Sequence, residues 1–291
     1  MHRYLAECRE QIVSAGVLPA LGGHGVIEQN PDELSWLMAW CRTLGVRRWL
    51  EVGTSRGGLM ALVERELGAS TVGVNLFQPD QPVGGTVIVG DSHSAVVRDQ
   101  VERRGPYDAV LIDGDHSGPG VRQDAQWYGP LAGRLLAIHD TLGLRDCEPV
   151  RDFWDEAKDA LSTADAWVEF DADDYRAGIG VILRGGGVSV VLPHRRSPIN
   201  DEALALAARS WHADPGIVRA VHVLDGPGDP YVLWNEHVPG AATDMILFTN
   251  SDVVLADDWL RITLPHARRG RVVFGLLAEP GAVGVNDTNV H

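Results

Sequence analysis

The stretch LEVGTSRGG at residues 50–58 constrains the fold of this chain more than any other segment. It reads as an apolar strand that ends near Glu51, a glycine-rich turn, and then an amphipathic helix, LMALVEREL. In an α/β sheet, such a junction presents backbone N–H groups and a helix N-terminus to a nucleotide-like ligand. Gly53 suits the tight turn, while Gly57 and Gly58 let a ligand approach the backbone closely. The stretch is therefore interpreted first as a binding loop.

Two common nucleotide motifs are absent from this loop. Ser55 and Arg56 do not match the GxGxxG pattern, and no GK[ST] follows to hold a triphosphate. NAD and ATP are accordingly poor candidates for its ligand. Glu51, at the strand end, is able to accept hydrogen bonds from hydroxyl groups or from an ammonium group.

The charge balance and the cysteines exclude several classes of protein. The formal net charge is −15, from 25 basic and 40 acidic residues, and no dense Lys/Arg block is present, so nucleic acid is not an expected partner. Cys8, Cys41 and Cys147 are scattered without CxxC spacing, which predicts neither a disulfide framework nor a zinc knuckle. No apolar run approaches the roughly 18 residues of a membrane span. We expect a cytoplasmic protein without a membrane anchor.

Apolar, strand-like runs alternate with helical patterns along the first part of the chain. Helices are expected over residues 3–15 and from Asn30 onward, where Asn30 is a suitable N-cap and Pro31 suits the first helical position. Strands are expected at residues 48–52, 70–75, 85–91, 107–115 and 134–140, with helical patterns between several of them. This alternation predicts an α/β fold with a doubly wound, mostly parallel sheet.

The chain is expected to form two units, because 291 residues with 45% hydrophobic content suffice for two cores. A strand at residues 178–184 runs into three glycines at 185–187, which is typical of a hinge. A second α/β pattern starts at residue 188. We therefore predict a first domain at 1–186, with N-terminal helices over 1–46, and a smaller domain at 187–291.

Unusual polar residues follow most of the expected strands of the first domain. They are Glu51 to Gly58, Asn75, Asp91 to His93, Asp113 to His116, and His139 with Asp140. Because parallel strands bring their carboxyl ends to one edge of a sheet, these residues are expected to border a single crevice.

Two of these acids, Asp113 and Asp140, directly follow apolar strands and have histidines close by. Two or three ligands that leave positions open for water and substrate are typical of a Mg²⁺ site. His116 is then a candidate general base toward a metal-bound hydroxyl. The alternative is that both acids cap the following helices and that the histidines are ordinary loop residues.

Residues from about 30 to 184 resemble the class I S-adenosylmethionine-dependent O-methyltransferases. The resemblance rests on IDGDHSGPGVRQD at 112–124, with its Gly120, Val121 and Asp124, and on LLAIHDT at 135–141. It implies a Rossmann-like methyltransferase sheet and a bound S-adenosyl-L-methionine. The implied cofactor-binding residues are Glu51, Gly53, Thr54, Ser55, Gly57, Asn75, Asp91, Ser92 and Asp113, with Asp91 and Ser92 near the adenine.

The resemblance also implies a metal site and a catalytic residue. In the related metal-dependent enzymes the matching positions are Asp113, His139 and Asp140, which would bind Mg²⁺ or Mn²⁺. His116 stands where those enzymes carry a catalytic lysine. Two positions depart from the family: Asn75 replaces the acid that usually holds the ribose hydroxyls, and Arg134 replaces the second glycine before the fifth strand. Neither change removes the fold.

The later part of the chain resembles the nucleotide-binding half of GT-A glycosyltransferases. Val188 to Pro193 match the first strand, Asp225 follows the second strand, and Asn250-Ser251-Asp252 match the DxD element. The resemblance implies that Asp252 binds Mn²⁺ or Mg²⁺ on a nucleotide-sugar. The segment is too short for the acceptor-binding half, so a partial GT-A-like domain is expected.

Two functions follow from these patterns. The first is metal-assisted O-methylation of a hydroxylated small molecule, or of a sugar or glycan acceptor. The alternative is a nucleotide-sugar-binding protein or glycosyltransferase whose first domain is structural. A homo-oligomer is expected in either case. Four aromatic residues are expected either to wall the acceptor pocket or to pack between helices, namely Trp127, Tyr128, Phe153 and Trp154.

Overall fold

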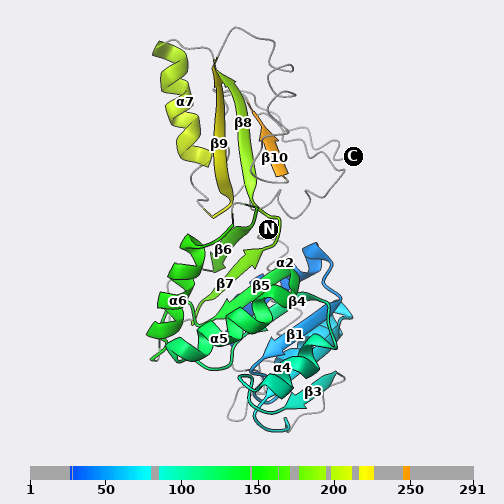
Figure 1. Cartoon of the computed structure of the whole chain (residues 1–291). Helices are drawn as coiled ribbons and strands as arrows, with labels where there is room; N and C mark the ends of the chain where they lie inside the picture. Colours follow the sequence, from blue (N-terminus) through cyan, green and yellow to red (C-terminus); the bar gives the residue numbers. More distant parts are fainter. Residues whose placement is uncertain are drawn as a thin grey trace.

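The computed structural model (Figure 1) describes most of the first 225 residues and one later strand. The described residues are 27, 29–79, 85–144, 146–162, 164–170, 177–194, 198–211, 216–225 and 245–249. The helix expected at 3–15 lies outside them, and so does Asp252.

A seven-stranded sheet forms the larger part of the structure. Its strands lie in the order β3-β2-β1-β4-β5-β7-β6. The bounds are β1 Arg48–Val52, β2 Ser70–Asn75, β3 Thr86–Val89, β4 Tyr107–Ile112, β5 Ala132–His139, β6 Ala166–Phe170 and β7 Ile179–Leu183. The pairs from β3 to β5 are parallel, and β7 runs antiparallel to both β5 and β6. The predicted Rossmann-like, doubly wound sheet is confirmed, while β6 was not predicted.

Helices cover both faces of this sheet. Their bounds are α2 Pro31–Leu44, α3 Gly58–Leu67, α4 Ala95–Glu102, α5 Gly118–Tyr128 and α6 Glu148–Asp159. On β4, Ala109 and Leu111 pack in the core that contains α2 and α3, whereas Val110 and Ile112 pack with α4, α5 and α6. This alternation follows from the two-residue period of a strand, and burial on both faces explains why the strands are almost wholly apolar.

The local signals that begin α2 act as expected. The side chain of Asn30 accepts a hydrogen bond of 2.8 Å from the backbone N–H of Asp32, and Pro31 is the first helical residue. Gly45 ends the helix in the left-handed conformation, with φ of 67°. No helix in the described part of the chain is long and apolar enough to cross a membrane.

A smaller parallel sheet, in the order β10-β8-β9, follows the first one along the chain. Its elements are β8 Val188–His194, α7 Pro198–Trp211, β9 Val218–Asp225 and β10 Met245–Phe248. A backbone hydrogen bond connects the first sheet to the segment that leads into the second, because Trp167 N–H of β6 donates to Gly216 O, just before β9. The division of the chain at residue 186 stays a prediction.

Candidate functional site

The glycine turn after β1 packs directly against the end of β4. Gly53 has φ of 92°, and its N–H donates to Val74 O at 2.9 Å. A Cβ at Gly53 would overlap the backbone carbonyl of Asp113. Gly57 caps α3 with φ of 82°, and Ser55 also has a positive φ, of 43°. The two most distinctive sequence motifs therefore lie side by side at the carboxyl edge of the sheet.

Asp113, His139 and Asp140 form a compact cluster at this edge. Nδ1 of His139 is 3.2 Å from Oδ1 of Asp113 and 3.1 Å from Oδ2 of Asp140. All three side chains are close to fully buried, with exposed fractions of 9–11%. Asp140 has φ of 63°, a left-handed conformation that aspartate tolerates better than most residues.

The interpretation of these acids as helix caps is wrong. Ser117 caps α5, since its side chain accepts the N–H of Gly120 at 3.1 Å. Cys147 occupies the N-cap position of α6. Asp113 and Asp140 are thus left to face the imidazoles.

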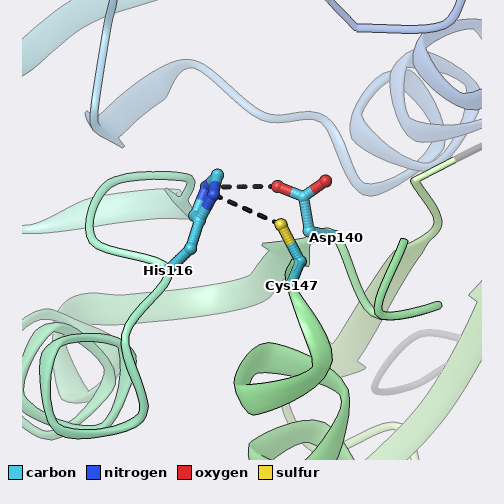
Figure 2. Close-up of side chains that lie close together, drawn as sticks. All are labelled: His116, Asp140 and Cys147. Carbon is cyan, nitrogen blue, oxygen red and sulfur yellow. Dashed lines mark hydrogen bonds and ion pairs between the residues drawn. The ribbon is translucent and has the colours of Figure 1, made fainter. Parts of the chain in front are cut away.

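His116 adds a second imidazole to the cluster. Its Nε2 is 3.1 Å from Oδ2 of Asp140 and 3.6 Å from Oδ1 of Asp113. Its Nδ1 is 3.4 Å from Sγ of Cys147 (Figure 2). The side chain of His116 is 42% exposed, so its ring extends from the buried acids to the protein surface.

The charges of the cluster stabilise one another. Burial by itself raises the pKa of Asp113, but His139 and His116 outweigh burial and hold that pKa well below its usual range. Burial by itself lowers the pKa of His139, yet Asp113, Asp140 and Glu33 raise it well above the usual value. The nearby carboxylate of Asp113, together with that of Asp140, raises the pKa of His116 against the opposing effect of burial. Without a ligand, imidazolium–carboxylate pairing is therefore favoured.

Two further residues that the sequence did not single out contact this cluster. Nε2 of Gln29 donates to Oδ2 of Asp113 at 2.6 Å. Oε2 of Glu33 is 3.6 Å from Nε2 of His139, while its Oε1 accepts the N–H of Gly178 at 2.9 Å. Glu33 is fully buried. In the sequence, the place of Glu33 in the first turn of α2 indicated only a favourable interaction with the helix dipole, and not a role in the cluster.

The donor set fits a divalent cation. Ligand atoms of Asp113, His139 and Asp140 all lie within 4.8 Å of one another. Nδ1 and Nε2 of His139 and Oε2 of Glu33 are buried and reach ion-pair distances, but they make no hydrogen bond of good geometry. Two carboxylates and one imidazole are suitable ligands for Mg²⁺ or Mn²⁺. The assignment of a metal to these residues stays a prediction.

Glu51 and Asn75 lie on the neighbouring strands β1 and β2. Glu51 is 1% exposed, and burial, followed by the charge of Asp113, raises its pKa to about 8. The amide nitrogen of Asn75 donates to the carbonyl oxygens of Ser55 and Phe77, at 2.9 Å each. Asn75 thereby holds the glycine turn, and its Oδ1 is the atom left to accept a hydroxyl. Thr54 is buried in the same turn.

Asp91 and Ser92 form a turn after β3. Oδ1 of Asp91 accepts the N–H of His93 at 2.9 Å, and the carbonyl of Ser92 accepts the hydroxyl of Tyr128 at 2.6 Å. Nε2 of His93 is 3.3 Å from Oδ1 of the fully buried Asp124. These contacts fix the turn on α5, and its expected role near an adenine stays a prediction.

The aromatic residues pack between helices and sheet. Tyr128 and Trp154 are fully buried in the core, which confirms the packing interpretation for them. Trp127 and Phe153 are partly buried against the same core.

Arg134, at the start of β5, pairs with Asp108 at 3.3 Å, so it lies at the opposite end of the strand from the cluster.

No protein-family model and no curated protein matches the chain. Among solved structures, it is similar to an O-methyltransferase from Bacillus cereus in complex with SAH, with 15% identity and a TM-score of 0.42 over 61% of this chain and 91% of that one.

The O-methyltransferase TomG from Streptomyces achromogenes, in complex with SAM, shows 15% identity and a TM-score of 0.41, over 62% of this chain and 89% of that one. The MycE methyltransferase from the mycinamycin pathway shows 16% identity and a TM-score of 0.43, over 61% of this chain and 53% of that one. None of these three structures supports the GT-A resemblance, and the expected metal ligand Asp252 lies outside the described residues.

Proposed function

We propose that this chain is an S-adenosylmethionine-dependent O-methyltransferase that acts on a hydroxylated small molecule or sugar. One observation carries the proposal: the glycine turn after β1 touches the backbone of Asp113, so a binding loop and an acid–imidazole cluster share one sheet edge. A methyl donor in the turn would then lie next to groups able to activate a hydroxyl.

The turn has features suited to the donor. Gly57 caps α3 without a side chain, so the first-turn N–H groups of α3 would be available to a carboxylate or to hydroxyls of the donor. The buried carboxyl of Glu51 would ionise on meeting the ammonium group of the methionine moiety, which gives a charge-assisted hydrogen bond. Oδ1 of Asn75 would accept one ribose hydroxyl, without the charge that an acid would provide.

The reaction requires an acceptor oxygen in line with the sulfonium methyl group. The oxygen–carbon bond forms as the carbon–sulfur bond breaks, and the sulfur keeps the electron pair. Were a cation to be held by Asp113 and Asp140, these acids would no longer favour the imidazolium form of His116, and its neutral Nε2 would take the proton of the acceptor hydroxyl. Asp140 would stabilise the imidazolium that results, and water would take up the proton from the side chain, which is 42% exposed.

Asp113, His139 and Asp140 would hold the cation, Mg²⁺ or Mn²⁺. When bound, it would lower the pKa of the accepting hydroxyl, an effect for which two vicinal oxygens on the acceptor are best suited. Glu33 and Gln29 orient the histidine and the aspartate of this set from behind.

The test is to titrate S-adenosylmethionine calorimetrically, with and without Mg²⁺, and to assay transfer of a labelled methyl group to pooled phenolic compounds and glycans. Asp113→Ala should retain the cofactor but lose turnover by roughly 10²-fold or more. Asp99→Ala, which removes an exposed carboxylate on α4, is the matched control. Absence of cofactor binding in the wild type would overturn the proposal. Full activity of Asp113→Ala would contradict the metal-assisted part of the proposal.

A further inference from the structure

Three side chains of different ligand type meet beside the cluster of Asp113, His139 and Asp140. Sγ of Cys147, at the start of α6, is 3.4 Å from Nδ1 of His116. Asp140, after β5, has Oδ2 at 3.1 Å from the other ring nitrogen, Nε2. Figure 2 shows the three side chains directed toward one another from separate elements of the fold. A thiol, an imidazole and a carboxylate thus converge.

We propose that His116, Asp140 and Cys147 form a second cation subsite that prefers Zn²⁺ to Mg²⁺. One ligand atom from each residue lies within 4.8 Å of the other two. Zinc bonds of about 2.3 Å to sulfur and 2.0 Å to nitrogen, at a tetrahedral angle, place these atoms about 3.5 Å apart. The observed distance from Sγ to Nδ1 is 3.4 Å. The three ligands leave the fourth tetrahedral position to water.

Ligand type distinguishes this subsite from its neighbour. Asp113, His139 and Asp140 offer hard oxygens and one imidazole, whereas Cys147 supplies sulfur, which favours Zn²⁺ and disfavours Mg²⁺. Asp140 belongs to both sets, so occupation of one subsite competes with occupation of the other.

Cys147 is suitable as a ligand. It is 5% exposed, takes part in no disulfide, and does not cap α6 with its side chain. On binding, the S–H bond breaks, the thiolate donates an electron pair to Zn²⁺, and the proton passes to the buffer. No oxidation or reduction takes place.

Zn²⁺ in this subsite would engage His116 and Asp140 and so withdraw both from methyl transfer. This consequence rests on the proposed function, whereas the binding of Zn²⁺ does not. Zn²⁺ should therefore inhibit Mg²⁺-supported turnover in the wild type and inhibit Cys147→Ser much less.

The test uses Co²⁺ as a spectroscopic probe on the full-length, metal-free chain. A thiolate ligand gives Co²⁺ a charge-transfer absorption in the near ultraviolet, which Zn²⁺ should abolish by displacement and excess Mg²⁺ should not. Cys147→Ser should lack this absorption and bind Zn²⁺ at least about tenfold more weakly. Cys41→Ser, which changes a buried thiol on α2, and Asp113→Asn should both retain it.

Lack of the thiolate absorption in the wild type, its persistence in Cys147→Ser, or equal displacement by Mg²⁺ would overturn the subsite. Thermal unfolding checks that Cys147→Ser folds. His116→Gln, at a partly exposed position, gives a second variant with the same expected loss of Zn²⁺ affinity. If no methyl transfer is detectable at all, the proposed function fails while the Co²⁺ spectrum still decides the subsite.

Discussion

Glu51 and Asp113 end adjacent strands of one sheet, and both side chains are removed from water, yet their pKa values shift in opposite directions. Burial raises the pKa of Glu51 to about 8, because only the weak hydrogen bond from Trp49, at 3.4 Å, opposes it. Two imidazoles and the amide of Gln29 reverse the effect of burial at Asp113 and lower its pKa. Burial alone therefore does not decide the charge of an acid at this edge.

The comparison separates two kinds of binding region. Around Glu51 the described residues supply no cation, so the carboxyl favours its neutral form until a cationic ligand arrives. Around Asp113 the protein supplies its own cations, which a metal ion would have to replace. The first region suits an ammonium or sulfonium compound, and the second suits a metal.

Gly53 is the residue at which the turn near Glu51 packs on the backbone of Asp113, so its substitution tests the contact between the two regions. We expect Gly53→Ala to reduce the free energy of unfolding by about 5 kcal/mol, because a left-handed backbone is strained by a Cβ and the Cβ meets the carbonyl of Asp113. Gly185→Ala is the matched control: φ is 64°, but no atom of the described residues lies within 4 Å of the added Cβ, so only about 1–2 kcal/mol of strain is expected. Urea unfolding of both variants measures the difference. Equal losses would contradict the packing of the turn on β4.

Removal of a built-in cation tests the second region. His139→Asn leaves Glu33, Asp113 and Asp140 without their buried imidazole. We expect the free energy of unfolding to fall by about 3–5 kcal/mol near pH 6. The lowered pKa of Asp113 stabilises the fold above the usual carboxyl pKa, and this contribution is lost as the pH falls through the folded value. The deficit of the variant should therefore begin to shrink only as the pH falls below about 4, the usual carboxyl pKa.

The same unfolding series should include Arg122→Gln, which breaks an exposed pair with Glu156 and should cost less than about 1 kcal/mol. A deficit of His139→Asn that is no larger than this control would refute the charge pairing proposed for the cluster.

The third test is at Glu51, where no contact is broken and only the cost of ionising a buried acid is removed. Its raised pKa stabilises the fold below the usual carboxyl pKa, and this contribution is lost as the pH rises through about 8. Without ligand, Glu51→Gln should thus gain stability over the wild type progressively as the pH rises from about 5 to about 8. Thermal unfolding from pH 5 to pH 9 measures the gain, with the exposed Glu102→Gln as control. A gain that does not depend on pH would exclude a buried neutral acid.

Much of the first sheet was predictable, because strands buried on both faces leave apolar runs that end in polar residues. The Asn30 cap, the turn at Gly53 and the meeting of Asp113, His116, His139 and Asp140 at one edge all follow from such patterns. The strand β6 and the antiparallel direction of β7 did not, since a short strand carries little periodicity and direction leaves no mark in the sequence. The roles of Trp127 and Phe153 were left open because helical spacing is the same for packing and for lining a pocket.

By itself, the sequence determined which residues end strands, where glycine permits a left-handed turn, and hence which side chains gather at one edge of a parallel sheet. These are local properties, repeated with the period of a strand or a helix. Only the tertiary structure decided that Glu33, Gln29 and Cys147 join the cluster, and that Glu51 and Asp113 differ in charge. Those features depend on distances of a few ångströms between residues far apart in the chain, and such distances are set by packing.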